Sequence, residues 1–223
     1  AESEYCLDSQ ILMENAGRGA VEALLEEFPD AGASTEVLVF AGKGNNAGDA
    51  FVFARRLICL DRKVRVFHIR PWDEYTGATK RNFEILRQMK ARMLHLDTVS
   101  ELESFFRSST GPFTVVDGLL GTGLKGNLSG IFYDVVEAVN RMADQSIIRE
   151  VISLDLPTGV NGDTGEVCGA SIQASLTVSF GFPKLGHFLP PGAAARGKLV
   201  NVDISLPPRF RREGRHFLLR PTP

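Results

Sequence analysis

Residues 36–50, with the sequence EVLVFAGKGNNAGDA, decide the fold of this chain. The first six residues form an apolar run of strand length, a Gly/Asn-rich loop follows, and a helical pattern occupies residues 49–60. Gly42, Gly44 and Ala47 fit the G-x-G-x-x-G/A pattern that joins a strand to a helix in dinucleotide-binding folds. The stretch therefore predicts a strand–loop–helix unit whose loop faces a ligand.

Apolar strands and amphipathic helices alternate along most of the chain. Helices are predicted over residues 9–28, 49–60, 79–93 and 129–142. Strands are predicted over residues 36–40, 64–69, 113–116, 151–154, 176–180 and 198–206, the last two without a helix between them. Such alternation indicates right-handed crossovers and buried parallel strands. We therefore expect an α/β fold, a three-layer αβα Rossmann-like sandwich with a mostly parallel central sheet.

Length and composition limit the domain organisation and the class of protein. The 223 residues suffice for one large domain, which we place at residues 1–208, with residues 209–223 as an exit segment or linker. A hydrophobic share of 43% excludes a disordered chain. The net charge of −2 lacks the basic footprint of a nucleic-acid-binding protein, so no nucleic-acid partner is expected.

The sequence also bears on the cellular location of the protein. The apolar runs fall far short of the roughly 20 residues that a membrane span needs, so no membrane partner is expected. No basic-then-apolar leader precedes the first predicted helix. The three cysteines have spacings that no zinc site uses and are interpreted as reduced thiols. Together these features predict a cytoplasmic protein.

The loop over residues 42–50 is the first of three segments that follow predicted strands and carry polar chemistry. Its asparagine carbonyls and Asp49 can receive hydroxyls or hold a cation, and free N–H groups at a helix start suit a phosphate. The acidic residue expected after the next strand in an NAD site is replaced by His68, Ile69 and Arg70. A structural alternative is an Asx-rich turn with Asp49 as the helix N-cap.

The other two segments, residues 117–127 and 155–161, each begin with an aspartate at the end of a predicted strand. Lys125 in the first can pair with a phosphate, and Thr158 in the second adds a hydroxyl. Amide, carboxylate and hydroxyl oxygens suit a hard cation, and a single charged ligand favours a monovalent ion. The structural alternatives are a plain loop with a solvated lysine and an Asp-initiated turn. The histidines share no spacing that indicates a zinc site or a catalytic triad.

Five segments in register resemble one known family, the YjeF N-terminal domains or NAD(P)H-hydrate epimerases. They are LMENAGR at 12–18, GNNAGDA at 44–50, VDGLLGTGL at 116–124, DLPTGVNGDTG at 155–165 and FGFPKLG at 180–186. Ala47 and Ala50 stand where the family has glycines, in its pattern G-N-N-G-G-D-G. If either position needs a positive φ, alanine costs about 1 kcal/mol there and reshapes the loop. Thr158 replaces the serine of the family's D-I-P-S-G and keeps the hydroxyl.

The resemblance implies an isomerase of metabolite repair that interconverts the R and S epimers of NADH or NADPH hydrated at C6 of the nicotinamide ring. It also implies a K⁺ ion held by Asn46, Asp117 and Thr158, a homodimer, and a C-terminal dehydratase domain in bifunctional members. The residues that it implies for substrate contact are Asn45, Asn46, Ala47, Gly48, Asp49, Gly121, Thr122, Gly123, Leu124, Lys125, Gly126, Asn127 and Asp155.

Asp155 is our candidate for the group that protonates the departing C6 hydroxyl and later deprotonates the incoming water. Lys184 is a second candidate as proton donor. A cation lowers a nearby carboxyl pKa and burial raises it, so Asp155 is expected to be more desolvated than Asp117 or farther from the ion. Two alternatives stay open: a catalytically degenerate nucleotide-binding or scaffold module, and an NAD(P)-dependent oxidoreductase.

Overall fold

A seven-stranded sheet forms the centre of the molecule in the computed structural model, which describes residues 5–124, 126–207 and 210. The strand order is β3-β2-β1-β4-β5-β6-β7, and all neighbouring strands pair in parallel. The strands are β1 Glu36–Ala41, β2 Val64–His68, β3 Arg92–His95, β4 Phe113–Gly118, β5 Ile148–Leu154, β6 Leu176–Phe180 and β7 Lys198–Val202.

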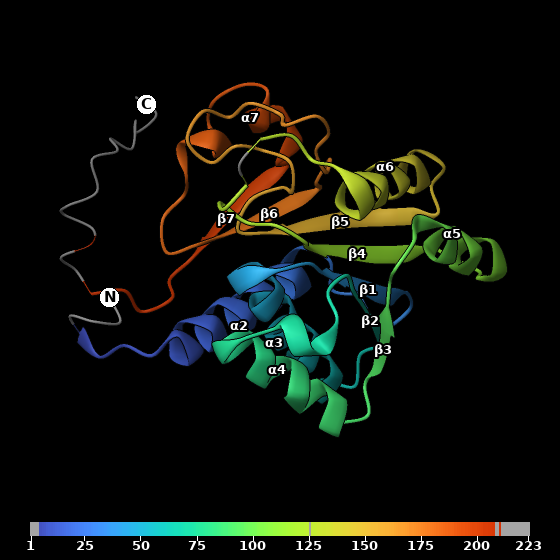
Figure 1. Cartoon of the computed structure of the whole chain (residues 1–223), viewed down its shortest axis with the longest axis horizontal. Coiled ribbons are helices and arrows are strands. Elements are labelled where there is room, and N and C mark those ends of the chain that lie inside the picture. The colour runs from blue at the N-terminus through green and yellow to red at the C-terminus, as the bar shows by residue number, and fades with distance from the viewer. Residues whose placement is uncertain (1–4, 125, 208–209, 211–223) are drawn as a thin grey trace.

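Helices cover both faces of this sheet (Figure 1). One face carries α2 Ser9–Glu27, α3 Gly44–Cys59 and α4 Gly77–Gln88, which also pack against one another. The other face carries α5 Val99–Ser108 and α6 Gly130–Asp144. The short elements are η1 Trp72–Glu74, η2 Leu185–His187 and α7 Gly192–Ala195. The expected three-layer αβα sandwich is thus confirmed.

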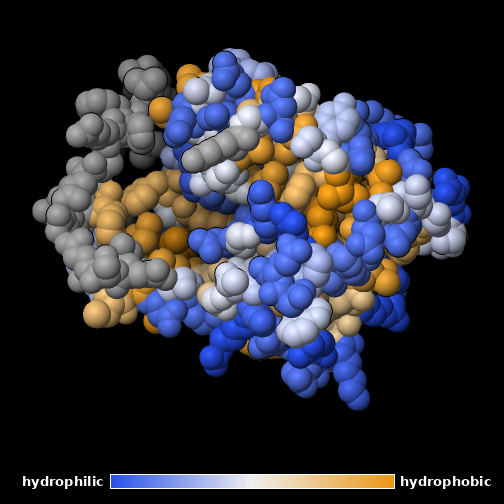
Figure 2. Space-filling model, in the orientation of Figure 1, coloured by the Kyte–Doolittle hydropathy of each residue, from blue (hydrophilic) through white to orange (hydrophobic). Residues whose placement is uncertain are grey.

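Two apolar clusters, one on each face of the sheet, form the core. The first includes Leu24, Phe51 and Phe83 from the three packed helices, and the second includes Leu102 and Val135 from α5 and α6. Strand β1 is buried along nearly its whole length, as a central parallel strand covered on both faces must be. In Figure 2 hydrophilic residues gather over the lower helical layer, and hydrophobic surface shows in the band between the layers.

The order in which strands are added to the sheet reverses between β1 and β4. Strands β2 and β3 extend the sheet on one side of β1, whereas β4 to β7 extend it on the other side. Gly42 lets the two strand ends approach, because a Cβ at Gly42 would lie 1.9 Å from the Leu119 carbonyl oxygen. In open α/β sheets this reversal leaves a crevice at the carboxyl ends of the strands.

Helix α3 begins five residues earlier than the sequence pattern predicts. Gly44 turns into the helix with a φ of +71°, and Lys43 is the N-cap. The predicted loop at residues 42–50 is therefore helical from Gly44 onward, and the alternative of Asp49 as N-cap is wrong. Asparagines have low helix propensity, which is why the pattern did not reveal these first turns.

Strand β3 and helix α5 were not predicted, and the helix predicted over residues 79–93 ends at Gln88. β3 is a four-residue edge strand with alternate residues exposed, so it lacks the apolar run of a buried strand. The capping box of Thr98 and Glu101 was the available signal for α5. β7 ends at Val202 rather than at residue 206, and η2 and α7 lie between β6 and β7, where no helix was predicted.

Ala47 and Ala50 lie inside α3, fully buried, and neither has a positive φ. The conditional cost of alanine at a left-handed position therefore does not arise. Among the described residues no helix is long and apolar enough to cross a membrane. The three cysteines form no disulfide. Of the predicted exit segment, only Phe210 lies within the described residues.

Replacing Ala50 by the family's glycine is expected to destabilise the protein. Glycine in a helix interior costs about 1 kcal/mol relative to alanine, and the buried methyl group is lost as well. Urea unfolding of wild type and Ala50→Gly at one temperature measures the difference in free energy. An increase in stability on Ala50→Gly would contradict the unstrained helical backbone at this position.

Candidate functional site

A cavity of about 490 Å³ opens at the carboxyl ends of β1, β4 and β5. It is lined by residues that follow each of these strands: Lys43, Gly44, Asn45, Asn46, Asp49, Leu120, Gly121, Thr122, Gly123 and Asp155. Three segments more than 30 residues apart in sequence thus meet where the strand order reverses, which is the usual ligand position in open α/β sheets.

The first turns of α3 form one wall of the cavity. Lys43, Gly44 and Asn45 are exposed, whereas Asn46 is buried and Asp49 is partly buried. Backbone N–H groups at a helix start have no partner within the helix, which makes this wall suitable for an anion. Both polar atoms of the Asn46 amide are buried, and neither has a hydrogen-bond partner among the described residues.

Asp117 is the penultimate residue of β4 and is 1% exposed. Its Oδ2 accepts hydrogen bonds from Ser153 Oγ at 2.9 Å and from the Thr158 backbone N at 2.8 Å. Its Oδ1 accepts from Thr158 Oγ1 at 2.6 Å and from the Leu119 backbone N at 3.2 Å. All four of these donors are neutral groups.

The Thr158 hydroxyl both donates and accepts a hydrogen bond. Oγ1 donates to Asp117 and accepts from the Leu120 backbone N at 3.0 Å. Oγ1 also lies 3.1 Å from the Leu120 carbonyl oxygen, which can share the hydroxyl proton with Asp117. Gly121 lies between the predicted ion ligand Asn46 and Asp155, because a Cβ at this glycine would be 3.5 Å from Asn46 Cβ and 3.7 Å from Asp155 Oδ2. A side chain at position 121 would fill the space between them.

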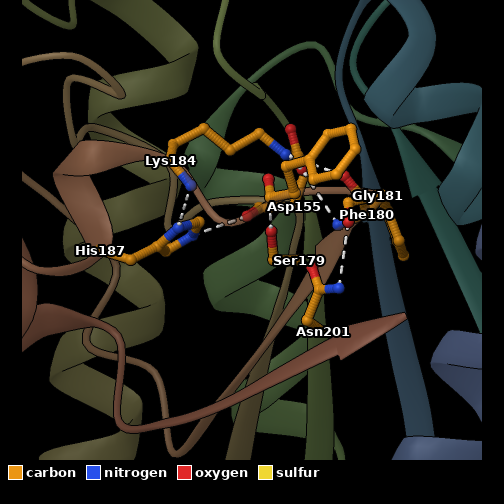
Figure 3. A network of polar contacts seen from close by, with 8 residues as sticks. Asp155, Ser179, Phe180, Gly181, Lys184, His187 and Asn201 are labelled. Atoms are coloured by element: carbon orange, nitrogen blue, oxygen red, sulfur yellow. Dashed lines mark hydrogen bonds and ion pairs between the residues drawn. The ribbon is translucent and has the colours of Figure 1, made fainter. Parts of the chain in front are cut away.

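Asp155 follows β5 in a left-handed conformation, with a φ of +65°. Its side chain is 16% exposed and forms an ion pair with Lys184, whose ammonium group also donates to the Phe180 carbonyl oxygen at 3.2 Å (Figure 3). Non-glycine residues in this region of φ cost energy and gather at functional sites. The strained aspartate at the cavity wall is therefore a candidate for chemistry rather than for folding.

Burial and neighbouring charge separate the carboxyl groups of the site. The pKa of Asp49 is raised well above its usual value, mainly by burial and then by the negative charge of Asp155, while Lys184 opposes both. Burial also raises the pKa of Asp117, although its four hydrogen bonds favour the charged form. Asp49 is therefore a neutral hydrogen-bond donor over a wider range of pH than an ordinary aspartate.

Several of the residues predicted for substrate contact do not line the cavity. Ala47 is fully buried in α3, and a Cβ at Gly48 would meet Met13 and Thr79 rather than the cavity. Leu124 packs against the core on the α6 side, and Gly126 and Asn127 are exposed outside the cavity lining. Lys125 lies outside the described residues.

One of the two alternatives expected for Asp155 does not hold. Asp155 was expected to be more desolvated than Asp117 or farther from the ion, and it is the more exposed of the two, which leaves the greater distance from the ion. It stands at the cavity wall, whereas Asp117 lies beneath the strand ends. Asp155 is thus distinguished from Asp117 by its ion pair with Lys184 rather than by deeper burial.

Two polar residues around the site were not predicted from the sequence. Ser153 points from β5 to Asp117, and His187 contacts the backbone of Asp155. The position of Ser153 two residues before Asp155 in a buried strand was the only available signal for it. No signal indicated His187, since its partner lies 32 residues away. Among the described residues no cluster of three or more His, Cys, Asp or Glu forms a metal site.

Comparisons with known proteins show what this chain is similar to. The family model described as YjeF-related protein N-terminus matches residues 9–186. The bifunctional NAD(P)H-hydrate repair enzyme Nnr of Moorella thermoacetica is 38% identical over 210 residues, covering 94% of this chain and 39% of that protein. An NAD(P)H-hydrate epimerase of Rhodopirellula baltica is 38% identical over 213 residues, covering 96% of this chain and 82% of that protein.

Solved structures include a related fold. The crystal structure of yeast YNL200c superposes with a TM-score of 0.69 at 28% identity, covering 86% of this chain and 77% of the yeast chain. The present chain spans about two fifths of the length of the bifunctional relatives that it matches. The match to the family model extends over most of the chain and includes the segments that form the cavity. This chain therefore belongs to the family of YjeF-related protein N-termini.

Proposed function

We propose that this chain is an isomerase that interconverts the R and S epimers of NADH or NADPH hydrated at C6 of the nicotinamide ring. The observation that carries the proposal is the cavity at the strand reversal, where Asp155 with its partner Lys184 faces Asp49 and the start of α3. Relatives that are 38% identical over nearly the whole chain are named for this substrate, which supports the assignment.

The chemistry requires one bond to C6 to break and form again on the other face of the ring. The C6 hydroxyl takes a proton and leaves as water, and the adjacent ring nitrogen stabilises the resulting cation. Water then adds to the opposite face and returns the proton, so the reaction is balanced without an oxidant or reductant. General acid–base help of this kind is typically worth about 10²–10⁴-fold.

Asp155 and Lys184 divide the proton transfer in this proposal. Asp155 borders the cavity and lies within hydrogen-bonding distance of the Lys184 ammonium group, so a proton can pass between them. The carboxyl group exchanges the proton with the departing and incoming oxygen, and Lys184 stabilises its charged form. Asp49, whose pKa is raised, donates a hydrogen bond to a substrate oxygen when it is protonated.

The polar groups beneath the cavity fit a K⁺ ion. Asn46 has a buried carbonyl oxygen without a hydrogen-bond partner among the described residues, Thr158 adds a hydroxyl oxygen, and Asp117 adds a buried carboxyl group whose hydrogen bonds favour the charged form. A set of oxygen donors with a single carboxylate matches a monovalent cation. When bound, the ion would supply the positive charge that compensates the buried Asp117.

The degenerate-module alternative has lost its main support. It rested on Ala47 and Ala50, which lie in an unstrained helix and leave the cavity open. We further propose that the chain forms a homodimer, as the family resemblance implies. A C-terminal dehydratase domain is proposed from the bifunctional relatives, of which this chain matches about two fifths.

An epimer-exchange assay tests the function. One isolated epimer of hydrated NADPH is incubated with the protein in potassium buffer, and the ratio of R to S is followed by chromatography. Interconversion well above the rate without protein is expected. A folded protein that binds hydrated NADPH without accelerating exchange would refute the proposal and return attention to a binding module.

The variant Asp155→Asn is expected to lose turnover and to keep affinity for hydrated NADPH. Asparagine tolerates the left-handed φ of this position, so the backbone is kept while the proton-transferring carboxyl is removed. The rate of exchange and the Kd from calorimetry measure the two effects separately. Wild-type exchange in this variant would remove Asp155 from the chemistry.

Potassium is expected to raise the Tm of the wild-type protein relative to choline at equal ionic strength. A ligand that binds only the folded state stabilises it by about 2.7 kcal/mol at a hundredfold excess over Kd. Asn46→Ala is the matched variant, since the side chain it removes makes no hydrogen bond among the described residues. Its Tm in choline should be close to that of wild type, and the potassium effect should be absent. Equal wild-type Tm in the two salts would contradict the ion site.

Asp49→Asn is expected to stabilise the protein more at pH 8 than at pH 5. Because the folded-state pKa of Asp49 lies above the ordinary 3.8, the folded state holds a proton that the unfolded state has released. Wild-type stability therefore falls as pH rises toward the folded-state pKa, and asparagine removes this loss. Urea unfolding at both pH values gives the difference, with exposed Asp73→Asn as control. A pH-independent difference for Asp49→Asn would contradict the raised pKa.

A further inference from the structure

His187 is a completely buried imidazole beside the active-site cavity, in a position that the proposed chemistry does not use. It ends the short helix η2, and its relative exposure is 0%. It is not among the residues that line the cavity. Its ring nevertheless lies against the backbone of Asp155, as Figure 3 shows. A buried polar ring in a core is stable only when its nitrogens are paired, so their partners reveal its role.

The two ring nitrogens have different partners, and these determine the tautomer. The backbone N–H of Lys184 donates to Nδ1 at 2.9 Å, and a backbone N–H can only donate. Nδ1 therefore carries no proton. Nε2 lies 2.8 Å from the Asp155 carbonyl oxygen, which can only accept, so the ring proton lies on Nε2. Burial lowers the pKa of His187, which agrees with a neutral ring.

The imidazole thus connects the main chains of the two residues that form the ion pair at the cavity. Through Nε2 it holds the carbonyl group of Asp155, whose φ of +65° is unfavourable for a residue with a Cβ. Through Nδ1 it holds the amide of Lys184. The His187 main chain is held in turn by Arg196, whose Nε donates to the His187 carbonyl oxygen at 2.6 Å.

The backbone amide and the carboxyl group of Asp155 have partners of their own in β6. The Asp155 amide donates to the Val178 carbonyl oxygen at 2.7 Å, which attaches the N-terminal side of the residue to β6. The carboxyl accepts from the Phe180 amide at 3.4 Å, a long contact. Among the described residues, His187 donates the hydrogen bond that the Asp155 carbonyl group accepts, so it opposes rotation of the peptide that follows the strained residue.

We propose that His187 is a positioning residue that keeps Asp155 and Lys184 in register with each other and with the cavity. The inference rests on the proposed acid–base role of Asp155 and goes beyond it, because His187 touches neither the cavity nor the reacting atoms. A neutral imidazole suits this role because it donates on one side and accepts on the other. No aliphatic side chain can replace both contacts.

Three substitutions separate the two hydrogen bonds from packing. His187→Asn keeps an acceptor near the position of Nδ1 and loses the donor to Asp155. His187→Gln keeps a donor near Nε2 and loses the acceptor for the Lys184 amide. His187→Phe keeps a planar apolar ring and loses both. His68→Asn is the control for loss of a buried imidazole. His68 in β2 is buried, and its ring contacts the Arg70 carbonyl oxygen.

Steady-state epimer exchange is expected to show a loss in kcat with little change in KM. His187→Phe should lose about 10²-fold in kcat, the size of effect that a misplaced reacting group causes. His187→Gln and His187→Asn should each recover part of this loss, and His68→Asn should retain wild-type kcat. Equal kcat for wild type and a folded His187→Phe would overturn the proposal, because packing alone would then suffice.

A second readout keeps this test separate from that of the proposed function. Hydrogen exchange of the Lys184 amide, followed by NMR, should be slow in wild type and in His187→Asn and faster in His187→Gln. The ¹⁵N shifts of the wild-type ring should show a proton on Nε2 alone. If wild type fails to epimerise, the function is refuted while these signals still judge the contacts of His187. Equal amide exchange in wild type and His187→Gln, or a proton on Nδ1, would refute the positioning role.

Discussion

The arrangement of the site depends on one buried carboxyl group, that of Asp117. Removing a carboxylate from water is costly unless hydrogen bonds or a counter-charge replace the lost solvation. Here the replacement comes from Ser153 in β5 and from the amide and hydroxyl groups of Thr158 in the following loop. Asp117 therefore draws the end of β5 and its loop against the end of β4.

This attachment determines where Asp155 stands. Asp155 lies between the two segments that Asp117 holds, two residues after Ser153 and three before Thr158. With both sides secured, the chain between them can maintain a positive φ that a free loop would relax. His187 and Lys184 reach the same residue from the segment after β6. The strain at Asp155 is thus supported from two neighbouring strands.

The three aspartates of the site lie in three different environments, and this distinguishes their carboxyl groups chemically. Asp117 is buried among neutral donors, the pKa of Asp49 is raised by burial and by the nearby Asp155, and Asp155 is paired with a lysine. Groups of the same type whose environments differ in this way can take different chemical roles. Residue type alone would not distinguish them.

Much of the fold was predictable because buried parallel strands leave continuous apolar runs in the sequence. The same reasoning missed β3, whose edge position exposes alternate residues, and it placed the start of α3 at Asp49, since the Asn-rich first turns lack an apolar pattern. Residues after the strand ends were predictable as site candidates because carboxyl ends of parallel strands meet at one edge. Seven of those predicted for substrate contact line the cavity: Asn45, Asn46, Asp49, Gly121, Thr122, Gly123 and Asp155.

The sequence by itself determined the layered α/β architecture and the three polar segments. It also determined the family resemblance, which implies Asn46, Asp117 and Thr158 as the ligands of an ion. These depend on local patterns, in which each residue is interpreted with its neighbours in the chain. Only the tertiary structure decided the burial of each carboxyl group, the pairing of Asp155 with Lys184 and the place of His187. Solvation and hydrogen bonding across 29 or 32 residues depend on how distant segments pack, and no local pattern records them.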